Sequence, residues 1–71
     1  MDRMRSLRQI VTLADAGNFR KAAERLGVTH SALSQAIAKL EDSYGVPLFV
    51  RNKQETVPTA FGRRMVEAAR S

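Results

Sequence analysis

Residues Phe19–Glu41 read FRKAAERLGVTHSALSQAIAKLE, and this stretch decides the fold. Its first part carries apolar residues at the spacing of one helix face: Phe19, Ala22, Ala23 and Leu26. Asn18 precedes them and can cap a helix by accepting a hydrogen bond from a free backbone N–H. Gly27 follows them and can take the left-handed conformation that ends a helix. The pattern therefore predicts a short helix over residues 19–26 and a tight turn after it.

A second helix follows the turn and is predicted to run from a cap at Thr29 to about Tyr44. Its apolar stripe consists of Leu33, Ile37, Leu40 and Tyr44. Ala23 stands four residues before Gly27, where a small side chain lets the two helices approach closely. Together they predict a helix-turn-helix, whose second helix enters the DNA major groove with its N-terminus first. An ordinary three-helix bundle with a glycine turn is the alternative interpretation.

The flanking sequence completes a small winged domain. Before the stretch, one helix face is formed by Leu7, Ile10, Val11 and Ala14, and that helix ends at Ala16. After it, residues 48–51 and 55–57 are predicted strands joined by a turn at 52–54, which we call the wing. Thr59 is then expected to cap a last helix with an apolar stripe of Phe61, Met65 and Ala68 or Ala69. The fold class is therefore mainly α, a winged helix-turn-helix with a three-helix core.

Length and charge narrow the function classes. The 71 residues fit one domain, and the formal net charge of +5 suggests a polyanionic partner, either nucleic acid or an anionic membrane surface. No apolar run approaches the roughly 18 residues of a membrane span, and a membrane-surface role is disfavoured because the helices use their apolar faces in the core. With one histidine, no cysteine, and Glu41 and Asp42 expected to be solvated, we predict neither an enzyme, a metal site nor a cofactor. A cytoplasmic protein is expected.

The sequence also resembles a known family. The run Phe19–Glu41, the segment GVPLFVR at 45–51 and the segment TAFG at 59–62 look like the N-terminal domain of LysR-type transcriptional regulators. The resemblance implies a winged helix-turn-helix over residues 1–58. It also implies that residues 59–71 begin a long linker helix that pairs two subunits. The family's effector-binding domain is absent from this sequence, so no small-molecule effector is expected within it. Both a shortened DNA-binding domain and a naturally short protein stay open.

The polar residues at the start of the second helix of the motif are candidates for reading base edges: Thr29, His30, Ser31, Ser34 and Gln35. The family often has arginine where Gln35 stands, which indicates a different preferred DNA sequence. Five cations are candidate phosphate contacts: Arg20, Lys21, Lys39, Arg51 and Lys53. Backbone N–H groups at the start of the helix over 19–26 are expected to assist Arg20 and Lys21 in holding a phosphate.

These patterns predict sequence-specific binding of double-stranded DNA by a transcriptional regulator of LysR type. The helix over about 29–44 is expected in the major groove, and the wing on the backbone or in the minor groove. The alternative function is a helical interaction module without specific DNA reading. In it, two copies would pair through Phe61, Met65 and Ala69, and the same homodimer could also coexist with DNA binding.

Overall fold

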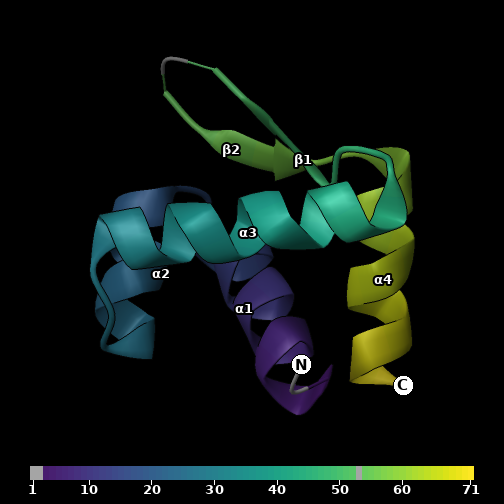
Figure 1. The fold of residues 1–71 in the computed structure, drawn as a ribbon, viewed down its shortest axis with the longest axis horizontal. Coiled ribbons are helices and arrows are strands. Elements are labelled where there is room, and N and C mark those ends of the chain that lie inside the picture. Colours follow the sequence, from purple (N-terminus) through teal and green to yellow (C-terminus); the bar gives the residue numbers. More distant parts are fainter. Residues whose placement is uncertain (1–2, 53) are drawn as a thin grey trace.

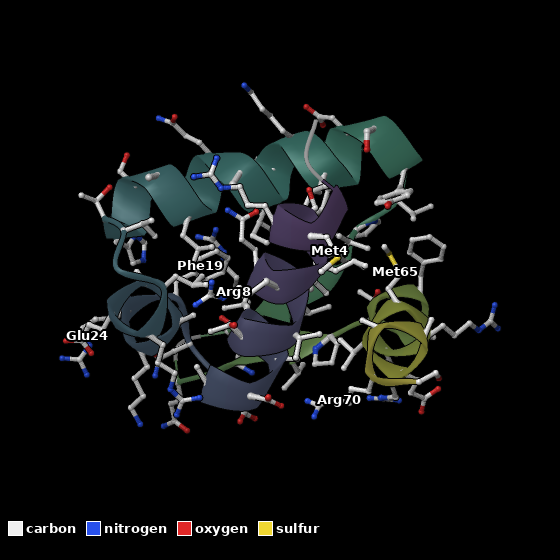
Figure 2. All side chains as sticks on the ribbon, turned by 90° about the horizontal axis from the view of Figure 1, so that it is seen from below. Met4, Arg8, Phe19, Glu24, Met65 and Arg70 are labelled. Carbon is white, nitrogen blue, oxygen red and sulfur yellow. The ribbon has the colours of Figure 1, made fainter. Side chains whose placement is uncertain are left out.

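The computed structural model describes residues 3–52 and 54–71. The elements are α1 (Arg3–Ala16), α2 (Phe19–Leu26), α3 (His30–Tyr44), β1 (Phe49–Arg51), β2 (Thr56–Pro58) and α4 (Ala60–Arg70). Helix α1 lies between α2 and α4, α3 crosses one side of all three, and the hairpin projects beyond α3 (Figures 1 and 2). This arrangement confirms the predicted winged helix-turn-helix. None of the described helices is both long and apolar enough to cross a membrane.

Three side-chain caps define where the helices begin. The side-chain oxygens of Asn18, Thr29 and Thr59 accept from the amides of Lys21, Ala32 and Gly62 at 2.8, 3.0 and 3.1 Å, respectively. Each cap satisfies an N–H that has no partner within its own helix. At the other end of α2, Gly27 takes a φ of 71°, so the chain reverses sharply into α3. Local sequence chemistry therefore fixes the helix boundaries that were predicted.

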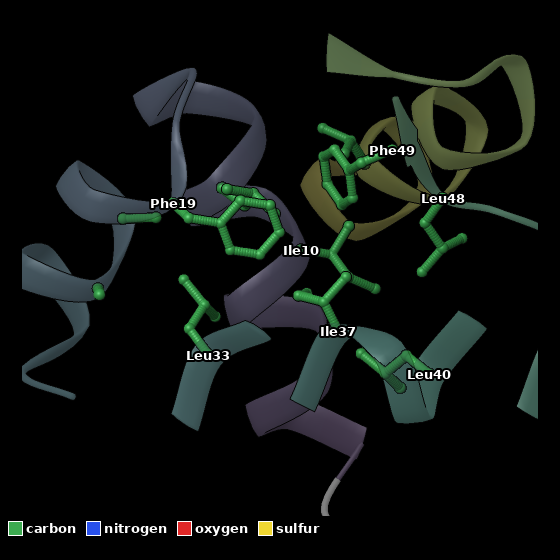
Figure 3. Packing of buried hydrophobic residues seen from close by; sticks show 11 residues of the cluster. Ile10, Phe19, Leu33, Ile37, Leu40, Leu48 and Phe49 are labelled. Atoms are coloured by element: carbon green, nitrogen blue, oxygen red, sulfur yellow. The ribbon is translucent and has the colours of Figure 1, made fainter. Parts of the chain in front are cut away.

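The core is formed by one cluster of apolar side chains in which residues of α1, α2, α3 and the wing meet (Figure 3). The inward positions predicted for the helix-turn-helix are largely confirmed: Phe19, Ala22, Ala23, Leu33, Ile37 and Leu40 are buried, and Leu26 is half-buried. On α1, Ile10 is buried as expected, whereas Leu7, Val11 and Ala14 are only half-buried. Leu13, outside the predicted face, is fully buried. The face of α1 is therefore rotated toward Leu13, because α1 packs against α2, α3 and α4 together.

The predicted apolar stripe of α3 was wrong at Tyr44, whereas the predicted stripe of α4 was not assigned to the core. Tyr44 is 46% exposed rather than part of the core, and its ring contacts Phe61 edge-on, with centroids 5.6 Å apart. On α4, the buried residues are Gly62 and Val66, while Phe61 is 37% exposed. Helix α4 therefore buries Gly62 and Val66 and leaves Phe61 at the surface.

The wing is an antiparallel pair in which Phe49 faces Pro58, Val50 faces Val57 and Arg51 faces Thr56. Strand β1 begins one residue later than predicted and ends at Arg51 as predicted, because Leu48 turns fully into the core. Strand β2 lies one residue later than predicted, because Pro58 joins the edge of the hairpin. The amide of Thr56 donates to the carbonyl of Gly17 at 2.8 Å. This bond ties the wing to the turn between α1 and α2.

The base of the wing is attached to α3 by Glu41. Its Oε2 accepts from the amide of Leu48 at 2.7 Å and from that of Phe49 at 3.2 Å. The expectation that Glu41 is solvated was therefore wrong for this residue, which is half-buried. The carboxylate satisfies two backbone donors at the point where the chain leaves the α3 turn for the wing. Thr59 closes the other side, since its amide donates to the carbonyl of Leu48 at 2.9 Å.

Candidate nucleic-acid interface

The first two turns of α3 present a polar surface on the side away from the core. Thr29, His30, Ser31 and Gln35 are exposed and Ser34 is half-buried. No acidic residue stands between Thr29 and Leu40. All five candidates for base reading therefore lie together, on a surface with no negative charge from α3 until Glu41, whose carboxylate points to the wing base.

Thr29 differs from the other four because its hydroxyl has a structural task. Its Oγ1 accepts the amide hydrogen of Ala32 and so caps α3. A hydroxyl has one hydrogen to donate and lone pairs to accept. The hydroxyl hydrogen of Thr29 thus stays available to an external acceptor, such as a phosphate oxygen. This makes Thr29 better suited to positioning the helix than to distinguishing bases.

Four side chains from three elements meet beside the start of α3. The Cζ atom of Arg51 lies 3.8 Å from the ring centroid of Phe19, and Nη2 of Arg51 donates to Oγ of Ser34 at 2.9 Å. The ring of His30 also packs on Phe19, with centroids 5.7 Å apart. We call this set the Arg51 cluster: Phe19, His30, Ser34 and Arg51. It joins the wing directly to the proposed reading surface.

Sequence reasoning placed Ser34 and Arg51 in separate roles and missed their contact. The two residues are 17 positions apart, and only the path of the wing brings them together. The pairing of a wing arginine with an aromatic residue at the start of α2 has no local spacing pattern. A chemical signal was nevertheless present, because arginine commonly stacks on aromatic rings and donates to hydroxyls.

Four of the five cations predicted to hold phosphates are exposed on the described part of the chain. Arg20 and Lys21 are exposed at the start of α2, Lys39 is exposed on α3, and Arg51 is exposed on β1. Lys53 lies outside the described residues. The backbone amide of Lys21 is occupied by the Asn18 side chain at 2.8 Å, so this one N–H at the start of α2 serves as the helix cap. The side chains of Arg20 and Lys21, with the other N–H groups at the start of α2, stay candidate phosphate contacts.

The three residues proposed for pairing two copies differ in their surroundings. Phe61 is exposed beside Tyr44. Met65 is half-buried and packs against the core cluster, close to the α1 side of the molecule (Figure 2). Ala69 is half-buried and lines a shallow apolar groove between α1 and α4, together with Leu7 and Val11. Among the described residues, no group of three or more His, Cys, Asp or Glu could hold a metal ion.

Comparison with known proteins agrees with this geometry. Residues 4–63 match the model of the family described as bacterial regulatory helix-turn-helix protein, lysR family. The chain belongs to the LysR family. The match spans α1, the helix-turn-helix, the wing and the first turn of α4. Its members are transcriptional regulators rather than enzymes.

Relatives and solved structures support the assignment. The small neutral protease regulatory protein of Streptomyces coelicolor is 40% identical over 94% of this chain and 20% of its own length. The regulator IlvR of Caulobacter vibrioides is 44% identical over 86% of this chain and 21% of its own length. The chain thus spans about a fifth of these curated relatives. Among solved structures, a CbnR DBD–DNA complex has a TM-score of 0.89 and 34% identity, covering 99% of this chain and 79% of that one.

Proposed function

We propose that this LysR-type domain binds double-stranded DNA sequence-specifically and serves as the DNA-reading part of a transcriptional regulator. The observation that carries the proposal is the exposed polar surface of α3, which has no acidic residue from Thr29 to Leu40 and is bordered by cations of α2, α3 and β1. Helix α3 would lie in the major groove, and the wing would contact the adjacent backbone or minor groove. The likeness to a solved complex of a LysR-family DNA-binding domain with DNA supports this docking.

Within this interface, base reading and backbone contact belong to different residues. Gln35 is exposed in the second turn of α3, and its amide can pair with N6 and N7 of adenine. Ser31 and His30 lie one turn earlier on the same exposed surface. Arg20 and Lys39 carry charge without a fixed base-reading geometry, so they are assigned to phosphates.

Replacing Gln35 with alanine is expected to relax the sequence preference at one base pair by roughly tenfold, which is the discrimination that a good side-chain pair with a base edge supplies. The measurement is a competition between the preferred duplex and its single-base variants, where the preferred duplex is first selected from randomised double-stranded DNA. Binding to unrelated duplexes should change little, because Gln35 carries no charge.

Arg20→Ala is the matched control. It should weaken binding to every sequence and reduce the slope of log affinity against log salt concentration by about one, since one phosphate contact is lost. The division of roles is wrong if both variants lower specific and nonspecific binding to the same extent. A wild-type chain that enriches no sequence from the random pool would contradict DNA reading itself.

We also propose that two copies pair through α4, which would place two reading helices on two half-sites. The supporting observation is the exposed pair of Phe61 and Tyr44, together with the groove between α1 and α4. Sedimentation of the 71-residue chain should show a mass that rises with concentration, and Phe61→Glu should remove that rise. A strict monomer at high concentration would exclude a stable pair formed by these residues.

A further inference from the structure

The contact between Arg51 and Ser34 has a chemical direction. A guanidinium carries only hydrogen-bond donors, so in this bond Oγ of Ser34 is the acceptor. The hydroxyl hydrogen of Ser34 is then left to donate elsewhere. Ser43 and Ser71 donate their hydroxyl hydrogens to backbone carbonyls three and four residues earlier. For Ser34, the hydrogen bond found among the described residues is the one it accepts from Arg51.

The guanidinium that makes this bond is held in place from a second side. Its Cζ lies 3.8 Å from the centroid of the Phe19 ring, which is itself 5% exposed and anchored in the core. A planar cation on an aromatic face has little freedom to swing away. In addition, Arg51 faces Thr56 across the hairpin, and Thr56 is tied by its amide to Gly17. The donor that faces Ser34 is therefore preorganised by both α2 and the wing.

Ser34 also lies at a position on α3 from which its hydroxyl hydrogen could be donated to a base edge. It stands one residue before Gln35 and three after Ser31, on the flank of the exposed surface that faces the wing. Its side chain is half-buried and bonded to Arg51, and the proposed docking of α3 would bring it to the DNA major groove. A serine hydroxyl without such a partner can donate to an acceptor or accept from a donor on a base edge, and so distinguishes bases poorly.

From this geometry we propose that Arg51 is a specificity-determining positioning residue: it fixes Ser34 as a donor, so that α3 selects an acceptor atom at one base position. Guanine O6 and N7, thymine O4 and adenine N7 would be accepted there, and the amino group of cytosine rejected. This inference rests on the proposed function and deepens it. Arg51 then acts on a base through Ser34, besides any contact of its remaining N–H groups with phosphate.

The test compares preferences rather than affinities. Preferred duplexes are selected from randomised double-stranded DNA with the wild-type chain, and every single-base variant is then measured with Ser34→Ala, Arg51→Gln and Arg51→Lys. Glutamine at 51 can accept the hydroxyl hydrogen of Ser34, whereas lysine can only donate to it. Arg51→Gln should therefore reduce the discrimination against cytosine by about fivefold at the same base pair that Ser34→Ala affects. Arg51→Lys should retain most of it.

Two further variants separate the positioning role of Arg51 from the effect of its positive charge alone. The double variant of Ser34→Ala with Arg51→Gln should be no more permissive at that base pair than Ser34→Ala alone, because both changes remove one coupled contact. Lys39→Gln makes the same charge change on α3 without touching Ser34, and should lower affinity equally for all sequences. Thermal unfolding of each variant checks that the fold is retained.

Several results would overturn the inference while leaving the proposed function intact. One is a wild-type preference that Arg51→Gln leaves unchanged despite a loss of affinity for every duplex. Another is that Ser34→Ala and Arg51→Gln change the preference at different base pairs. A third is that their effects on the preference at one base pair add in the double variant. If the wild-type chain selects no sequence at all, this result contradicts the proposed function itself and, with it, the inference about Arg51.

Discussion

Gly62→Ala is expected to destabilise the domain by about 3 kcal/mol and to lower its melting temperature by about 10–20 °C. A methyl group on Gly62 would stand 2.1 Å from the carbonyl oxygen of Leu48 and 3.0 Å from its carbonyl carbon. Both are backbone atoms, and Leu48 is fully buried with its carbonyl bonded to the amide of Thr59. The two backbone segments cannot keep this close approach, so α4 must move away from the base of the wing.

The sign of this effect distinguishes close approach from helix propensity. In an ordinary helix, glycine to alanine stabilises by roughly 0.5–1 kcal/mol. The matched control is Ala68→Gly on the exposed side of the same helix, which should destabilise by about 1 kcal/mol through propensity alone. Chemical denaturation followed by circular dichroism measures both variants. If Gly62→Ala raised the unfolding midpoint, the tight packing of α4 on Leu48 would be disproved.

The role of Gly62 marks a limit of what the sequence predicts about the fold. The helix-turn-helix could be predicted because its information is local: caps at Asn18 and Thr29, a turn at Gly27 and a periodic apolar stripe. The packing of α4 could not, because its buried face is set by Leu48, which is distant in sequence. Sequence reasoning therefore singled out the larger apolar residues of this helix for pairing two copies and gave no role to Gly62 and Val66, which are its buried residues.

The candidate site divides in the same way. The exposed polar surface of α3 follows from the position of its buried stripe, so Ser31 and Gln35 lie where the period predicts. The Arg51 cluster depends on the path of the hairpin and on its register, and the predicted strand ranges did not specify which residues pair. A strand shifted by one residue turns its side chains to the other face. The contacts of the wing with α2 and α3 therefore could not be predicted from the spacing of residues in the sequence.

Removal of the Glu41 carboxylate should have the second large effect. Glu41→Ala leaves the amides of Leu48 and Phe49 without their acceptor at a half-buried site, and is expected to destabilise the domain by about 3 kcal/mol, since two bonds to a charged group are lost. The loss should be concentrated at the wing, because these amides lie where the chain enters β1. Hydrogen exchange of the wing amides should therefore accelerate more than that of the α2 amides.

Glu41→Gln is the graded control for this prediction. Its side-chain oxygen can still accept from both amides but without the negative charge, so the loss should be below half that of alanine. Asp42→Ala removes an adjacent, exposed carboxylate and should change stability by less than about 0.5 kcal/mol. The wing also positions Arg51 beside Ser34. Glu41→Ala should therefore weaken DNA binding even at temperatures where the variant is fully folded. Equal stability of the Glu41→Ala and Asp42→Ala variants would show that the wing base does not depend on Glu41.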